Sequence, residues 1–112
     1  LGYNVKSEVR IVKDNEIIEL EDLQLKIIHM PGHTPGGIAL HMKKPTDKIL
    51  FTGDTLFCQG IGRSDLAGGD EYLLIKSIKE NLLTLADDTV IYPGHGPSST
   101  IGEERRNNPY LI

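Results

Sequence analysis

The chain has 112 residues and a mass of 12.4 kDa, the size of a single domain. Hydrophobic residues make up 38% of it and charged residues 25%, as in globular proteins, and its net charge of -4 argues against a nucleic-acid ligand. The single cysteine, Cys58, excludes an internal disulfide and favours a reducing compartment, so we expect a cytoplasmic protein. No apolar run reaches the roughly 20 residues of a membrane helix, and we expect no signal peptide and no membrane partner.

Short strands are predicted throughout the first half of the chain. Apolar and polar residues alternate at residues 9–11, 23–28 and 38–43, whereas residues 17–18 and 49–51 are short apolar runs, and turn residues separate these segments. Leu23, Leu25 and Ile27 are expected on the buried face of their strand. His41 falls opposite Leu40, on the polar side of the next strand, and is expected to be solvated. The pattern predicts a meander of antiparallel strands.

The second half of the chain changes to a helical period. Apolar residues recur every three or four positions from Leu74 to Leu85, which predicts an amphipathic helix of about four turns with Asp70 as its N-cap. A short strand is predicted at residues 90–92. Thr100 and Glu103 form a capping box that opens a brief C-terminal helix, and Pro109 ends it.

Three loops of the chain share one design. Each follows a buried strand, contains glycine, and carries one polar group that can bind a metal: His33, Asp54 and His95. Taken singly, a histidine or aspartate beside glycine is more often a turn residue than a ligand. Imidazole and carboxylate groups are, however, ligands that zinc and iron prefer, so the threefold repetition favours a shared metal site at the strand ends.

Five motifs follow one another along the chain: Pro31 to Gly37, Phe51 to Phe57, Gly62 to Asp65, Gly68 to Asp70 and Tyr92 to Gly96. In this order they resemble the motifs of the metallo-β-lactamase superfamily, and within it those of the glyoxalase II-like (hydroxyacylglutathione hydrolase-like) enzymes. The resemblance implies an α/β (α+β) fold, part of a four-layer αββα sandwich with the metal site at one edge. Mostly antiparallel strands would precede the amphipathic helix, the short strand and the short C-terminal helix.

The resemblance also implies roles for single residues. His33 corresponds to a ligand of the first metal, Asp54 to the carboxylate that bridges two metals and orients the reacting water, and His95 to a ligand of the second metal. The cofactor would be two zinc ions, with iron or manganese as alternatives. A metal-bound hydroxide would attack the carbonyl of a small-molecule thioester such as an acylglutathione. Arg63 either leans over this substrate or forms a local ion pair with Asp65.

The chain departs from the family in one respect, because it contains no HxHxDH motif, which supplies the remaining ligands. We therefore interpret residues 1–112 as a single domain corresponding to the C-terminal half of the sandwich, with the N-terminal half absent. On this interpretation the chain alone binds metal weakly and is inactive. The inner face of its sheet then needs the missing half, or a second copy of the chain, as a cover.

Two alternatives to the hydrolase stay open. Persulfide dioxygenases of the same superfamily, which use a single iron, share the Gly62 to Asp65 pattern, although the form of Pro93 to Gly96 favours the hydrolase. The other alternative is a non-catalytic module that associates with itself. A helical metal site of His29 with His33 is excluded by Pro31 and Gly32 between them, and Cys58 is expected to be a small buried filler.

Overall fold

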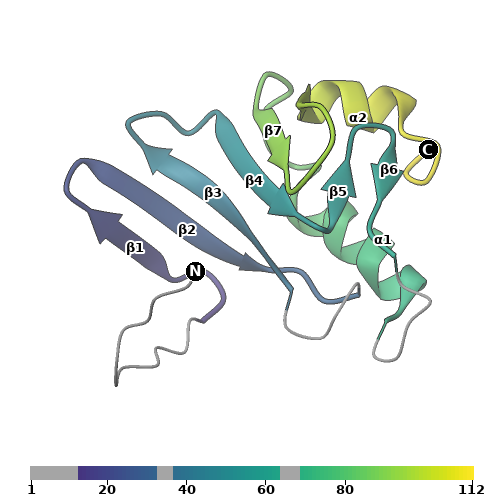
Figure 1. The fold of residues 1–112 in the computed structure, drawn as a ribbon, viewed down its shortest axis with the longest axis horizontal. Coiled ribbons are helices and arrows are strands. Elements are labelled where there is room, and N and C mark those ends of the chain that lie inside the picture. Colours follow the sequence, from purple (N-terminus) through teal and green to yellow (C-terminus); the bar gives the residue numbers. More distant parts are fainter. Residues whose placement is uncertain (1–12, 33–36, 64–68) are drawn as a thin grey trace.

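A mostly antiparallel sheet organises the fold of the computed structural model, which describes residues 13–32, 37–63 and 69–112 (Figure 1). In spatial order its six strands are β1 (Ile17–Leu20), β2 (Leu23–His29), β3 (Ile38–Lys44), β4 (Ile49–Gly53), β7 (Val90–Pro93) and β8 (Ser99–Thr100). Only β4 and β7 pair in parallel. A small hairpin of β5 (Leu56–Phe57) and β6 (Gly60–Ile61) and two helices, α1 (Glu71–Asn81) and α2 (Ile101–Asn107), complete the described part. The predicted α+β class is confirmed, and the strand predicted at residues 9–11 lies outside the described residues.

The helices and one face of the sheet enclose the hydrophobic core. Leu74, Ile78 and Leu82 are fully buried at helical spacing. They belong to one buried cluster with strand residues from the same face of the sheet and with α2, namely Ile28, Ala39, Leu50, Ile91 and Ile101. Fully burying one such side chain contributes on the order of 1.5–3 kcal/mol, so this face fixes where the helices lie.

Helix α1 begins as predicted but ends earlier. The Asp70 carboxylate accepts a hydrogen bond from the backbone N–H of Leu73, which confirms the predicted N-cap. The apolar stripe predicted about four turns, but the helix ends at Asn81, and Leu82 is its C-cap. Leu85 follows in a turn closed by its N–H and the Leu82 carbonyl, and it still packs against the core. The helical spacing of apolar residues therefore extends past the end of α1, into the turn that contains Leu85.

The prediction of a solvated His41 is wrong. The side chain is buried, with 5% of the residue exposed, and its Nε2 lies 2.8 Å from the carbonyl oxygen of Asp47. The cause is the side of the sheet on which α1 packs. Successive strand residues point to opposite faces, and the helices cover the face that carries Ala39 and His41. Leu40 and Met42 therefore point to the other face.

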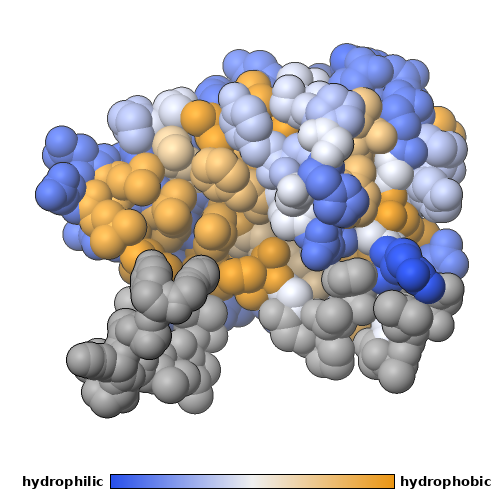
Figure 2. Space-filling model, viewed as in Figure 1, coloured by the Kyte–Doolittle hydropathy of each residue, from blue (hydrophilic) through white to orange (hydrophobic). Residues whose placement is uncertain are grey.

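Neither of the two described helices, α1 and α2, lies over that other face, which carries many apolar residues. One row of residues crosses this face from β2 to β7, each residue being the register partner of the next: Ile27, Leu40, Phe51 and Tyr92. Phe51 and Tyr92 are exposed and their rings stack at 5.9 Å. Hydrophobic side chains also gather over β1 and β2, at the left of Figure 2. Of the three residues predicted on the buried face of β2, Ile27 is buried, and Leu23 and Leu25 are half-buried.

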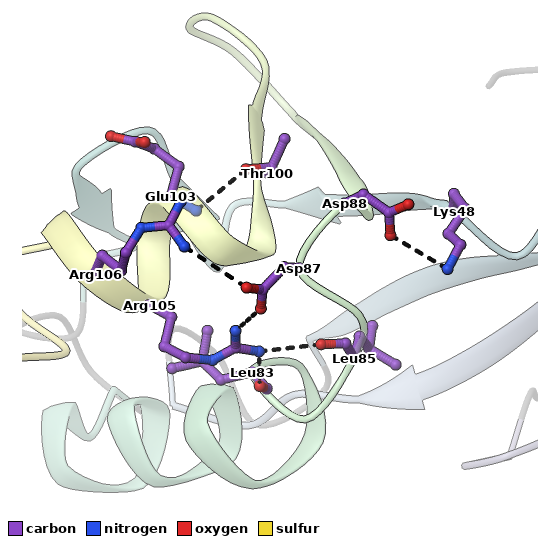
Figure 3. Close-up of polar contacts among 9 residues, drawn as sticks. All are labelled: Lys48, Leu83, Leu85, Asp87, Asp88, Thr100, Glu103, Arg105 and Arg106. Carbon is purple, nitrogen blue, oxygen red and sulfur yellow. Dashed lines mark hydrogen bonds and ion pairs between the residues drawn. The ribbon is translucent and has the colours of Figure 1, made fainter.

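Helix α2 is tied to the segment that follows α1 (Figure 3). The N-cap half of the predicted capping box is present, since the Thr100 hydroxyl accepts from the backbone N–H of Glu103 at 3.1 Å. The Glu103 carboxylate accepts a hydrogen bond from the Asn107 side chain. The Arg105 guanidinium donates to the carbonyl oxygens of Leu83 and Leu85 and to the Asp87 carboxylate. One side chain thus satisfies backbone acceptors just beyond α1 and joins the two helical segments.

No helix within the described ranges is both long and apolar enough to cross a membrane.

Candidate metal centre

The sheet topology brings three strand ends to one edge. Strands β2 and β4 each run antiparallel to β3, so they share a direction, and β7 is parallel to β4. Their C-terminal ends therefore lie at the same edge of the sheet, which Figure 1 shows at the lower right of the strands. The chain leaves this edge through the loops that follow His29, Gly53 and Pro93. These are the loops in which the sequence places His33, Asp54 and His95.

The first loop is held at its described ends. The backbone N–H of Met30 donates to the Gly37 carbonyl at 2.7 Å, and the N–H of Asp70 donates to the Gly32 carbonyl at 2.7 Å. Gly32 has a φ of +134°, and a Cβ on it would lie 2.4 Å from the Cα of Leu74, so only glycine fits against α1. His33 itself lies outside the described residues. The anchored ends therefore place only the start and end of its loop at this edge.

The second loop carries Asp54 between two buried threonines. The Thr52 hydroxyl donates to the Leu56 carbonyl at 2.7 Å, and the Thr55 hydroxyl donates to the Thr52 carbonyl at 2.6 Å. Both threonine side chains are thereby satisfied inside the fold, while Asp54 between them is exposed. The turn therefore fixes the backbone of Asp54 and leaves its carboxylate available.

The third loop joins the second through the backbone. The N–H of Gly94 donates to the Gly53 carbonyl at 2.8 Å. His95 follows immediately, and its Nε2 lies 3.6 Å from Oδ1 of Asp54. The two side chains are 75% and 57% exposed, so both can reach a ligand from solvent. The structure therefore brings together two of the three predicted ligands.

An aromatic ring and a cation complete the surroundings of this pair. The Phe57 ring stacks on the His95 imidazole, with centroids 4.7 Å apart and planes at 25°. Arg63, the predicted substrate-binding residue, is exposed and lines the same groove of about 260 Å³. Asp54, Phe57, Ile61, Gly62 and His95 form the rest of its lining. The sequence places Phe57 in a family motif but does not predict its contact with His95, because that contact depends on how the β5–β6 hairpin is positioned.

The donor chemistry of this pair fits a divalent metal, since zinc and iron bind imidazole nitrogen and carboxylate oxygen. Across residues 13–32, 37–63 and 69–112, no group of three or more His, Cys, Asp or Glu side chains could hold a metal ion. Asp54 and His95 therefore offer two donors, fewer than the three or four protein ligands of a zinc site. Cys58, predicted to be buried, is half-buried and is a free thiol.

A larger hollow of about 550 Å³ lies at the opposite edge of the sheet. It is lined by residues of the β1–β2 turn and the end of β3, namely Glu19, Glu21, Asp22, Gln24, Lys44 and Pro45. This set combines acidic groups with one lysine and holds no predicted ligand. The groove beside Asp54, although smaller, is therefore the better candidate for chemistry.

Comparison with known proteins establishes the family. The family model described as "Metallo-beta-lactamase superfamily" matches residues 2–95, and the chain therefore belongs to that superfamily. Over 101 residues it is 48% identical to a protein of Haemophilus influenzae named hydroxyacylglutathione hydrolase GloC, covering 88% of this chain and 46% of that protein. The chain spans about half the length of the curated relatives it matches, with shares of 49%, 46% and 52% in three of them.

Solved structures support the same assignment. The chain superposes on the BLEG-1 B3 metallo-β-lactamase with a TM-score of 0.83 and 40% identity, covering 90% of this chain and 47% of that one. The TTHA1623 protein, described in a di-iron-bound form, gives a TM-score of 0.80 and 38% identity, covering 93% and 49% of the two chains. The predicted superfamily and its fold are thus confirmed.

Proposed function

We propose that this chain supplies the Asp54 and His95 part of a metal-dependent thioester hydrolase of the glyoxalase II type. The observation that carries the proposal is the pairing of an exposed carboxylate and an exposed imidazole, 3.6 Å apart, at the edge where β4 and β7 end. Membership of a superfamily of metallo-hydrolases and the 48% identity to a protein named hydroxyacylglutathione hydrolase support it.

Asp54 and His95 would hold the metal together with His33, whose loop starts and ends at the same edge. Zinc is the expected ion, and iron is an alternative because a similar structure is described in a di-iron form. Such a metal, when bound, would supply Lewis-acid polarisation of a carbonyl and acidification of a water molecule. Asp54 would serve as a shared ligand of the metals, and its carboxylate would accept a hydrogen bond from the reacting water and so orient it.

Arg63 would act on the substrate rather than on the metal. An acylglutathione carries carboxylate groups, and a guanidinium binds a carboxylate through two parallel hydrogen bonds. Arg63 is exposed on the groove that also contains Asp54. It would therefore hold the thioester with its carbonyl toward the Asp54 end of the groove.

The apolar face beside Phe51 and Tyr92 needs a cover in the working enzyme. A soluble monomer rarely leaves so much contiguous apolar surface exposed. The curated relatives are about twice as long as this chain. A complementary segment about as long as this chain is therefore the expected cover, and a second copy of this chain is the alternative. The complete ligand set would form only when this cover is in place.

A chimeric protein tests the function. The segment of the Haemophilus influenzae relative that aligns with this chain would be replaced by this chain, leaving the rest of the relative unchanged. We expect metal-dependent cleavage of an acylglutathione, followed by thiol release, and loss of most of the rate with Asp54→Asn or His95→Ala. Lys48→Ala is the matched control, because Lys48 pairs with Asp88 at the surface. A folded chimera that loads metal without cleaving the thioester contradicts the proposal.

The same chimera distinguishes the proposed hydrolase from a persulfide dioxygenase. A mononuclear iron enzyme would consume oxygen with a glutathione persulfide and would contain one metal per chain, whereas the proposed hydrolase would contain two. Metal analysis beside the two assays therefore distinguishes the functions. Catalysis in neither assay would favour the non-catalytic module.

A further inference from the structure

The β5–β6 hairpin that carries Phe57 is too short to fix its own position. Each strand has two residues, and the turn between them contains Gln59 with a φ of +62°, a conformation that non-glycine residues seldom adopt. Isolated hairpins, even long ones, are marginally stable in water. At its base the hairpin is joined to the Asp54 loop, because the N–H of Gly62 donates to the Thr55 carbonyl at 3.0 Å. Its turn needs a separate anchor.

Helix α2 provides that anchor through two fully buried polar side chains. Glu104 accepts the backbone N–H of Gln59 at 2.9 Å, and the Asn108 amide donates to the Gly60 carbonyl at 3.1 Å. The amide of Asn108 also donates to Glu104 at 2.8 Å, so both residues hold the turn as one unit. A buried carboxylate is costly unless it is hydrogen-bonded, and here it accepts a further bond from the Ser99 hydroxyl.

The position of this unit relative to the site is specific. Gly60, which Asn108 holds, is the register partner of Phe57 across the hairpin. The Phe57 ring in turn stacks on His95, whose imidazole faces Asp54. Hydrogen bonds in a buried network are held in fixed geometry, so movement at the turn would be transmitted to the Phe57 ring.

We propose that Glu104 and Asn108 are positioning residues that hold Phe57 against the His95 ring and thereby set the orientation of the candidate metal ligand. The inference rests on the proposed function only for the role of His95. The clamp itself is a property of this chain, and it can be tested without metal or substrate.

The test uses the chemical shifts of the His95 ring protons in the 112-residue chain, at one fixed pH and with metal removed by a chelator. Phe57→Leu supplies the reference without an aromatic ring. We expect Glu104→Ala to move the His95 signals most of the way toward that reference. Glu104→Gln keeps an oxygen for the Gln59 N–H and can donate to Ser99, so its signals should stay near those of the unchanged chain.

Ser99→Ala is the matched control, because it removes a hydrogen bond from the same carboxylate on the side away from the turn. A general loss of stability would move the signals in Ser99→Ala as far as in Glu104→Ala, and that result overturns the proposal. Should Glu104→Ala fail to fold, Asn108→Ala decides, since it removes the bond to Gly60 and leaves two donors on Glu104. Unchanged His95 signals in a folded Asn108→Ala chain also overturn it. Inactivity of the chimera would refute the hydrolase without moving these signals.

Discussion

The backbone N–H of Gly94 donates a hydrogen bond of 2.8 Å to the carbonyl oxygen of Gly53. These two glycines immediately precede His95 and Asp54, so the loops that carry the two candidate ligands are joined directly through the main chain. The separation of 3.6 Å between the two side chains is therefore set by backbone contact at the end of the parallel pair β4–β7.

A side chain at residue 94 should push these loops apart. A Cβ there would lie 3.1 Å from the Gly53 carbonyl oxygen and 3.2 Å from Oδ1 of Asp54. We expect Gly94→Ala to lower the free energy of unfolding by about 1–3 kcal/mol, and Gly94→Leu to lower it further, because overpacking costs grow with size. Denaturant unfolding measures both values.

Gly96 provides the control for this series. Its φ is +89°, but a Cβ there would meet no atom within 4 Å. Gly96→Ala should therefore cost roughly 1–2 kcal/mol for the backbone conformation alone, and Gly96→Leu about the same. Equal costs for alanine and leucine at residue 94 would show that contact between the loops is not the cause.

Gly32 packs against α1 and should be much harder to replace than Gly60. Alanine at this position would place its Cβ 2.4 Å from the Leu74 Cα and 2.6 Å from the Leu74 nitrogen, in a backbone conformation with φ of +134°. The obstructing atoms belong to helix backbone, so the first turn of α1 must move. We expect Gly32→Ala to lower the free energy of unfolding by at least about 3 kcal/mol, beyond the usual range for one substitution.

Gly60→Ala is the comparison for Gly32. Its Cβ would lie 3.8 Å from the Phe57 Cβ, an ordinary contact, and its φ lies outside the left-handed region. Its effect should stay within about 1 kcal/mol of zero, since a compatible alanine also reduces the entropy of the unfolded chain. Similar losses at residues 32 and 60 would contradict the close packing of Gly32 on α1.

Sequence patterns predicted the positions of Asp54 and His95 at strand ends better than the surroundings of these residues. Glycine after a buried strand was enough to place Asp54 and His95 at strand ends, and the topology then brought them together. Phe57 lies in a strand of two residues, too short to show any period, so its hairpin could not be predicted. The sequence around Glu104 is typical of an exposed charged residue on a helix, whereas in the structure its buried carboxylate accepts hydrogen bonds from three donors.

The error at His41 has a different origin. Both sides of β3 carry apolar residues, and alternation alone favours the side of Leu40 and Met42 as buried. In the structure α1 and α2 cover the side of Ala39 and His41, and neither of these described helices covers the more apolar side. Which face of such a strand is covered depends on distant elements, and this information is absent from the local pattern.

The face of the sheet opposite α1 should drive self-association of the chain. Phe51 and Tyr92 are exposed in the middle of it and stack on each other at 5.9 Å. We expect sedimentation velocity to detect dimers or larger species, and Phe51→Lys to weaken association at least about tenfold, equivalent to roughly 1.4 kcal/mol. The charge would have to be buried at the contact, which is costly.

Tyr72→Lys controls for a general loss of apolar surface. Tyr72 lies on α1, on the covered side of the sheet, and is 75% exposed. Its replacement should leave association unchanged. A chain that stays monomeric at all concentrations, or equal effects of the two lysines, would argue against the sheet face as the contact.

Metal binding by the isolated chain should be weak. His33 and Asp54 would offer two donors to one metal, and His95 and Asp54 two donors to the other, whereas stable zinc sites use three or four protein ligands. We expect competition with a chelator at neutral pH to give a zinc dissociation constant weaker than micromolar, weakened further by Asp54→Ala or His95→Ala. His29→Ala, at the end of β2, should leave the constant unchanged, because Pro31 and Gly32 separate His29 from the helical geometry of a paired site. Sub-micromolar zinc affinity, or a loss with His29→Ala equal to that with His95→Ala, would mean that the chain already contains a complete site.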